Sequence, residues 1–141
     1  MMPAEFNITG KVVFITGAGR GIGKGIAQVL SEAGADVAIN ALTPKYVNGL
    51  AEELSTATGR RVAPIVADMT ITSDVQRAFD EVLAQFGRID VLVNALGDSI
   101  KKPLVALPGA DNVGTSISDD DLRFIMDINL TEALLSTRAV G

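Results

Sequence analysis

The 141-residue sequence contains no cysteine, no histidine and no tryptophan. Without cysteine it can form neither disulfides nor thiolate metal sites. Without histidine it lacks the commonest metal ligand and the commonest general base. It also lacks an uninterrupted apolar run of about 18 residues, the length that crosses a membrane. We therefore expect no metal site and no membrane segment.

Basic residues are scarce as well. Twelve Lys and Arg stand against 17 Asp and Glu, which gives a net charge of −5 and a pI near 4.6. An acidic protein repels the phosphate backbone, so we expect no nucleic-acid partner. The N-terminus has no basic region followed by an apolar stretch, as a secretory signal would. A cytoplasmic protein is the default expectation.

The most informative stretch that is present is VVFITGAGRGIGK, residues 12–24. Its first four residues are apolar without alternation, which predicts a strand buried on both faces of a parallel sheet. Thr16 ends the strand, and a helical pattern starts after a glycine-rich turn that contains Gly17, Gly19, Gly21 and Gly23. Such a turn presents bare backbone N–H groups at a helix N-terminus, where an anion is favoured. We therefore expect a phosphate-binding loop.

The spacing of the glycines decides between three kinds of loop. A nucleoside-triphosphate loop needs Gly where Ala18 stands, and Ser or Thr where Gly25 stands. The common dinucleotide pattern G-x-G-x-x-G fails at Ile22. The pattern that fits is T-G-x-x-x-G-x-G, formed by Thr16, Gly17, Gly21 and Gly23.

Strand and helix patterns alternate along the rest of the chain. Strands are predicted at residues 12–15, 36–40, 62–67 and 90–94. Helices are predicted at residues 22–33, from Pro44 to near Gly59, from an N-cap at Ser73 to Phe86, and from an N-cap at Ser118 to the chain end. This alternation predicts one α/β domain over residues 1–141: a doubly wound parallel sheet in three layers, with strand order 3-2-1-4, that stops after the fourth strand and its following helix.

Apolar stripes predict which helix faces are buried. In the first helix the stripe is Ile22, Ile26, Val29, Leu30 and Ala33, and in the last it is Leu122, Ile125, Met126, Asn129, Ala133, Leu134 and Thr137. Asn129 interrupts the last stripe. It either bonds a nearby backbone carbonyl and bends its helix, or it holds an ordered water in a proton relay.

Polar residues end all four predicted strands: Thr16, Asn40, Asp68 and Asn94. Ligands of doubly wound sheets bind beyond the carboxyl ends of the strands. We therefore expect these residues to surround one ligand.

The loop from Thr16 to Gly23 resembles the cofactor loop of the short-chain dehydrogenase/reductase family. Three further motifs resemble that family in order: Asp68-Met69-Thr70, Asn94-Ala95-Leu96-Gly97 and Asp127-Ile128-Asn129. The resemblance implies a Rossmann fold like that of 3-oxoacyl-carrier-protein reductases, with Asn129 as a catalytic residue. It also implies the cofactor-binding residues Gly17, Gly19, Arg20, Gly21, Ile22, Gly23, Asn40, Ala41, Asp68, Met69, Asn94, Ala95 and Gly97.

The cofactor implied is a nicotinamide dinucleotide. NAD-preferring members carry a carboxylate after the second strand, whereas residues 40–43 here read Asn-Ala-Leu-Thr. Arg20 resembles the arginine that contacts the 2′-phosphate in NADP-dependent members, and Asn40 and Thr43 are possible neutral donors. The hypothesis is NADP, with NAD as the alternative.

The sequence departs from the family in two places. Ala95 stands where the family has a second Asn, and Leu96 fills a small alanine position. The segment between Gly97 and Asn129 is also longer than usual, and its residues 98–118 form either a substrate-side loop or a surface loop without a role.

The activity implied is hydride transfer between NADP(H) and a small-molecule carbonyl or secondary alcohol. In the family a Ser and a Tyr-x-x-x-Lys motif carry this chemistry, and they would follow Gly141. The only tyrosine, Tyr46, is no candidate. We therefore expect the chain alone to be inactive, and the full-length protein to be a homo-oligomer, either a tetramer or a dimer. The alternative is a non-catalytic dinucleotide-binding subunit or sensor.

Overall fold

Strands and helices alternate along the chain as the sequence predicts. The computed structural model describes residues 7–105 and 116–141. Its elements are β1 (Val12–Thr16), α1 (Gly21–Glu32), β2 (Asp36–Ala41), α2 (Pro44–Thr58), β3 (Val62–Val66), α3 (Thr72–Phe86), β4 (Val91–Asn94), α4 (Asp119–Met126), the π-helix η2 (Asp127–Thr131) and α5 (Glu132–Val140). The predicted strands are confirmed to within a residue at each end.

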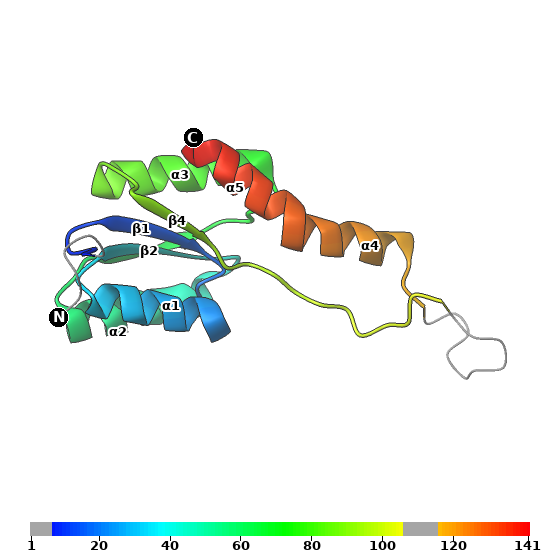
Figure 1. Ribbon diagram of the computed structural model, residues 1–141, viewed down its shortest axis with the longest axis horizontal. Coiled ribbons are helices and arrows are strands. Elements are labelled where there is room, and N and C mark those ends of the chain that lie inside the picture. The colour runs from blue at the N-terminus through cyan, green and yellow to red at the C-terminus, as the bar shows by residue number, and fades with distance from the viewer. Residues whose placement is uncertain (1–6, 106–115) are drawn as a thin grey trace.

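The four strands form one parallel sheet in the order β3-β2-β1-β4, which confirms the predicted topology. Figure 1 shows α1 and α2 on one face of the sheet, and α3 and α5 on the other. The result is the predicted three-layer, Rossmann-like arrangement. All strands therefore end at one edge, where the candidate ligand residues meet.

The central strand β1 is buried on both faces, which explains its unbroken apolar sequence. Val13 and Ile15 pack in the cluster that α1 and α2 cover, whereas Val12 and Phe14 pack in the cluster under α3. The Phe14 ring meets the Phe79 ring edge-on, with 5.1 Å between ring centroids. Alternate side chains thus enter two separate cores.

The predicted inner face of α1 is confirmed for Ile26 and Leu30, which pack against the core, and is wrong for Ile22 and Val29. Ile22 is 81% exposed and Val29 is 62% exposed, and the helix instead buries Gly23, Ala27 and Ser31. The small residues face the sheet because the glycine turn brings α1 very close to β1. A Cβ atom at Gly23 would lie 2.4 Å from the Gly17 carbonyl oxygen. Ile22 and Val29 therefore point to the outside.

The predicted N-cap of α3 at Ser73 is also wrong. The helix begins at Thr72, with Ile71 in the N-cap position and no side-chain cap. Asp74 in the first turn accepts a hydrogen bond from the backbone N–H of Asp68 at 3.0 Å, and this contact fixes the entry to the helix. The helix buries Val75, Ala78, Phe79 and Val82, while Leu83 is exposed.

The N-cap at Ser118 is confirmed. Its hydroxyl accepts a hydrogen bond from the Asp121 N–H at 3.1 Å, and the Asp121 carboxylate accepts one from the Ser118 N–H at 3.0 Å, which completes a capping box. A hydrogen bond from Lys102, joined by those from Ser118, lowers the pKa of Asp121 to about 2.

The predicted apolar stripe of the last helix does not face a core. Leu122 is 44% exposed, Met126 52% and Leu134 61%. Figure 1 shows the reason: α4 projects beyond the sheet, and only α5 lies on it. In α5 the buried residues are Glu132 and Ser136. Within residues 7–105 and 116–141, no helix has the length and apolar character that a membrane crossing requires.

A charged cluster closes the opposite end of the sheet. The Asp36 carboxylate at the start of β2 accepts hydrogen bonds from the guanidinium groups of Arg60 at 2.7 Å and Arg61 at 3.0 Å, and from the Arg61 N–H. Burial raises the pKa of Asp36, but the hydrogen bonds and charges of the two arginines outweigh it, so that the pKa lies below its usual value. The clamp holds β2 to the β3 edge.

Candidate functional site

The turn between β1 and α1 needs glycine for two different reasons. Gly17 and Gly21 have φ angles of +63° and +56°, in the left-handed region that side chains disfavour. Gly23 has an ordinary backbone but no space, because an added Cβ would clash with the Gly17 carbonyl oxygen and the Ala18 Cα. The glycines therefore build a tight turn that carries the chain directly into α1.

The amides at the start of α1 are open. Arg20 occupies the N-cap position with an extended backbone, and no side chain caps this end of the helix. Gly21 and Ile22, the first two residues of the helix, are exposed. In α4 the same groups are satisfied by a capping box. The α1 N-terminus is thus free to accept an anion.

Asn40 differs from its predicted role as a donor to the cofactor. It is 1% exposed, and its side-chain Nδ2 donates to the carbonyl oxygens of Ile65 at 3.2 Å and Ala67 at 3.1 Å. Its Oδ1 accepts from the Gly17 N–H at 3.3 Å. Asn40 therefore braces the glycine turn against β3, and both of its N–H groups are occupied. Ala41 is buried beside it.

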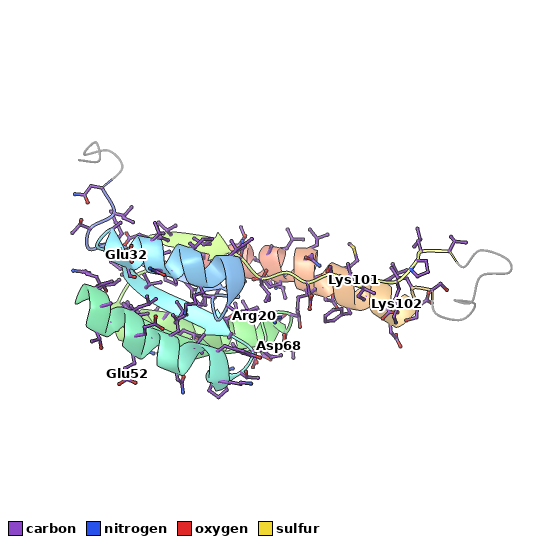
Figure 2. The ribbon with its side chains drawn as sticks, turned by 90° about the horizontal axis from the view of Figure 1, so that it is seen from below. Arg20, Glu32, Glu52, Asp68, Lys101 and Lys102 are labelled. Carbon is purple, nitrogen blue, oxygen red and sulfur yellow. The ribbon has the colours of Figure 1, made fainter. Side chains whose placement is uncertain are left out.

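Asp68 follows β3 by two residues and is partly exposed. Oδ1 accepts hydrogen bonds from the Thr70 N–H at 3.0 Å and the Thr70 hydroxyl at 2.6 Å. Figure 2 shows Asp68 and Arg20 at the same end of the sheet, while Lys101 and Lys102 lie on the projecting segment. Met69 is 1% exposed and packs in the core beneath, so its side chain cannot contact a ligand.

Two residues that the sequence analysis did not assign lie beside the turn. A Cβ at Gly19 would come within 2.6 Å of the Tyr46 Cβ, so the first turn of α2 packs against the glycine loop. The Lys45 ammonium lies 5.4 Å from the centroid of the Tyr46 ring. A second cation besides Arg20 thus stands next to the loop. A lysine at a helix start carries no sequence signal that would have distinguished it.

The end of β4 closes the other side of the turn. The Thr16 hydroxyl oxygen accepts a hydrogen bond from the Ala95 N–H at 3.2 Å. A Cβ at Gly17 would lie 2.7 Å from the Leu96 Cα, so the backbones of the two segments are in contact. The Asn94 Nδ2 donates to the Thr137 hydroxyl at 3.2 Å. Residues 94–97 are therefore fixed between the loop and α5.

Asn129 lies in the π-helix between α4 and α5. Its Nδ2 donates to the carbonyl oxygens of Asp98 at 2.9 Å and Ile125 at 3.0 Å. Its Oδ1 would be 2.8 Å from a Cβ at Gly97. The expected bond to a nearby helix carbonyl is present, and Asn129 also ties the segment after β4 to the helix. Its Oδ1 can still accept from water, and π-helices often mark functional sites.

Glu132 is the residue of this region that the sequence analysis missed. It is fully buried, and its Oε1 accepts a hydrogen bond from the Ser136 hydroxyl at 3.2 Å. Burial raises the pKa of Glu132, while the Thr16 and Ser136 hydroxyls oppose that change. Oε2 has no hydrogen-bond partner among the described residues. Nothing in the helical pattern marks a glutamate as buried.

Comparison with known proteins identifies the fold's family. A family model described as short chain dehydrogenase matches residues 11–141. The chain belongs to the short-chain dehydrogenase/reductase family. A short-chain dehydrogenase structure from Mycobacterium smegmatis superposes with a TM-score of 0.84 at 30% identity, covering 94% of this chain and 52% of that one.

Relatives of this short-chain dehydrogenase/reductase chain include a reductase-like protein and a reductase. Hydroxynaphthalene reductase-like protein Arp2 of Metarhizium robertsii is 43% identical over 98 residues, which are 69% of this chain and 36% of that protein. Peroxisomal 2,4-dienoyl-CoA reductase of Danio rerio is 34% identical over 122 residues, 86% of this chain and 37% of that one.

One structural relative is a complex with a nicotinamide dinucleotide. The blue fluorescent protein from a metagenomic library, in complex with NADPH, has a TM-score of 0.81 and 34% identity, covering 95% of this chain and 51% of that one. The chain thus spans about half the length of these structures, and its matched part is about a third of the length of the curated relatives.

Proposed function

We propose that this chain is the dinucleotide-binding part of an NADP(H)-dependent oxidoreductase that interconverts a carbonyl and a secondary alcohol. The observation that carries the proposal is the uncapped N-terminus of α1 behind a turn that only glycine can form. Membership of the short-chain dehydrogenase/reductase family supports the reaction class. The bound NADP(H) supplies or accepts the hydride.

The turn fits the two phosphates of a dinucleotide. Gly21 has nothing within 4 Å of its Cβ position, so a ligand can approach the backbone there. Its N–H group and those of Ile22 and Gly23 receive no side-chain cap from the part of the chain that the structure describes. Charge-assisted hydrogen bonds from backbone N–H groups contribute about 1.5–3 kcal/mol each. Gly17 and Gly19 contribute by letting the turn pack closely against Leu96 and Tyr46.

The choice of NADP over NAD rests on charge. Arg20 is exposed in the turn, and Lys45 lies next to the Tyr46 side chain that packs on Gly19. Two cations and no acid at residues 42 and 43 favour a 2′-phosphate over a ribose hydroxyl. The structural relative bound to NADPH supports the same choice.

The other candidate residues receive narrower roles. The partly exposed Asp68 accepts a hydrogen bond from the adenine amino group. Met69 is buried and contributes only its backbone. Asn40 and Ala41 are buried too, and they support the turn from beneath. Asn94, Ala95 and Gly97 line the nicotinamide side. Asn129 accepts a hydrogen bond from a relay water at Oδ1, while its Nδ2 group stays engaged with Asp98.

The proposal for the whole protein goes further than this chain. A Ser and a Tyr-x-x-x-Lys motif beyond residue 141 supply the acid/base group, so the isolated chain binds the dinucleotide but does not reduce carbonyl compounds. The substrate is a small molecule, and the full-length protein is a cytoplasmic homo-oligomer, either a tetramer or a dimer. A full-length sequence without that motif would instead favour a non-catalytic binding protein.

A titration of the Arg20→Ala variant with NADPH and with NADH tests the cofactor. We expect the affinity for NADPH to fall by about tenfold or more, because a charge-assisted contact to phosphate is lost, and the affinity for NADH to stay within about twofold. Arg123→Ala removes an exposed arginine of α4 and serves as the matched control. Equal losses for both dinucleotides would overturn the assignment of NADP, and no binding of either by the parent chain would overturn the proposed function.

A further inference from the structure

The backbone of Asp68 is held by the turn and first residues of α3 and not by the sheet. Its N–H donates to the Asp74 Oδ2 at 3.0 Å, and Asp74 lies in the first turn of α3. Its C=O accepts a hydrogen bond from the Ile71 N–H at 3.1 Å, which closes the turn into the helix. The preceding residue, Ala67, still donates to the Ala41 carbonyl of β2 at 3.2 Å. The chain therefore passes from the sheet to α3 between Ala67 and Asp68.

Arg77 completes this attachment one helical turn further on. Its Nη2 lies 3.3 Å from the Asp74 Oδ1 and donates to the Val66 carbonyl oxygen at 3.2 Å. The Arg77 guanidinium thus joins the last residue of β3 to the carboxylate that holds Asp68. The hydrogen bond from the Asp68 N–H, together with the Arg77 guanidinium, lowers the pKa of Asp74, so that its carboxylate is charged at neutral pH.

The Asp68 carboxylate is itself fixed at one oxygen and free at the other. Oδ1 accepts hydrogen bonds from both the N–H and the hydroxyl of Thr70. Within residues 7–105 and 116–141, no group donates to Oδ2. Two donors on Oδ1 hold the carboxylate plane, and the bond to Asp74 holds the backbone that carries it. The free oxygen therefore keeps one position at the ligand edge of the sheet.

The helix end alone does not explain the contact of Asp74. In a capping box the third helical residue accepts a hydrogen bond from the N–H of the N-cap residue, as Asp121 does from Ser118 in α4. Asp74 is the third residue of α3, but it accepts from Asp68, three residues before the N-cap Ile71. Its carboxylate therefore serves the residue at the ligand edge and leaves the N-cap N–H to the turn.

We propose that Asp74 is a positioning residue: it holds the Asp68 N–H, with Arg77 behind it, and thereby directs the Asp68 carboxylate at the adenine amino group of the dinucleotide. The proposal rests on the proposed function, which assigns Asp68 to the adenine. Asp74 acts through Asp68 and needs no contact of its own with the dinucleotide.

Three variants of the full-length protein test this role. Asp74→Ala removes the acceptor, whereas Asp74→Asn keeps the shape and one acceptor oxygen but loses the charge that pairs with Arg77. Asp80→Ala removes an exposed carboxylate of the same helix, which accepts from the Gln76 side chain at 3.0 Å, and is the matched control. Each variant is titrated with NADPH and with the analogue that carries hypoxanthine in place of adenine and so lacks the amino group. The hydrogen-exchange rate of the Asp68 amide is measured without nucleotide, and urea unfolding shows whether each variant is folded.

The parent protein should bind NADPH at least about tenfold more tightly than the hypoxanthine analogue, the effect of one hydrogen bond to a charged group. In Asp74→Ala we expect this preference to fall below about threefold, and the Asp68 amide to exchange about tenfold faster, because its charged acceptor is gone. Asp74→Asn should lie between these values and those of the parent. Asp80→Ala should stay within about twofold of the parent in both measurements, as surface substitutions usually do.

The outcomes separate this proposal from the proposed function. A folded Asp74→Ala protein that keeps the parent preference for adenine would overturn the positioning role, even if both dinucleotides bound more weakly. A parent protein that binds both dinucleotides equally would also overturn it, while the dinucleotide site itself would stand. If the parent binds neither, the proposed function fails, and the exchange rate still decides whether Asp74 holds Asp68. If Asp74→Ala is unfolded, parent values in Asp74→Asn would overturn the role, and a weakened preference with faster exchange would sustain it.

Discussion

Gly23 and Gly25 lie two residues apart in α1, and their replacement by alanine should have opposite effects. An added Cβ at Gly23 would lie 2.4 Å from the Gly17 carbonyl oxygen and 2.9 Å from the Ala18 Cα. At Gly25 nothing lies within 4 Å of the same atom. Both residues are helical, so the difference between the two variants reports the contact between the helix and the glycine turn.

The expected magnitudes follow from these distances. Real Cβ atoms do not approach within 3.0 Å, so Gly23→Ala must displace the Gly17 backbone by at least 0.6 Å, the difference between 3.0 and 2.4 Å. Overpacking of this kind costs about 1–3 kcal/mol. Gly25→Ala should instead stabilise the protein by about 1 kcal/mol, because alanine is the better helix former. That gain corresponds to a rise in the melting temperature of roughly 4 °C.

Urea unfolding and titration with NADPH measure the two effects. Gly23→Ala should lower both the free energy of unfolding and the affinity for NADPH, the latter by more than about tenfold, because the displaced turn carries the amides that face the phosphates. Gly25→Ala should keep the parent affinity. A Gly23→Ala protein with parent stability and parent affinity would refute the close packing of α1 on the turn.

Three further predictions concern stability. Asn40→Leu should lower the free energy of unfolding by on the order of 3 kcal/mol in urea, because it removes the hydrogen bonds that Asn40 makes to the Gly17 N–H and to the Ile65 and Ala67 carbonyls; a neutral effect would contradict the bracing role. Ser118→Ala should weaken α4 by about 1 kcal/mol, seen as faster amide exchange in that helix and nowhere else. Asp36 has a lowered pKa, so its stabilising contribution is present above its usual value of 3.8 and is lost as the pH falls through the folded value. Asp36→Asn should therefore flatten the acid limb of the stability curve, and an unchanged limb would contradict the Arg60–Arg61 clamp.

Much of the architecture could be predicted because it rests on local patterns. The unbroken apolar residues of β1 require cover on both faces, and the alternation of strands with helices requires parallel pairing. The T-G-x-x-x-G-x-G spacing locates the turn, because the backbone has positive φ angles at Gly17 and Gly21, and glycine at these positions is visible in the sequence. The capping box at Ser118 is local in the same sense.

The remaining features depend on distances between segments that no local pattern records. In α1 the close approach to β1 selects small residues for the most buried positions, so Ile22 and Val29 point outward although they share a stripe with Ile26 and Leu30. Asn40 looks like a ligand donor at a strand end, but its hydrogen bonds go to β3 and the turn. Glu132 is buried because α5, unlike α4, lies on the sheet, and no local pattern in the sequence shows which part of this helical segment does so.

The central claim is that the two phosphates of a nicotinamide dinucleotide rest on the amides of the turn between Thr16 and Gly23. The most direct test is an amide NMR titration of the ¹⁵N-labelled chain with NADPH. We predict that the largest shifts fall on the N–H groups of Gly21, Ile22 and Gly23, at the uncapped end of α1. Saturable binding that leaves these three amides unshifted, or no binding at all, would contradict the claim.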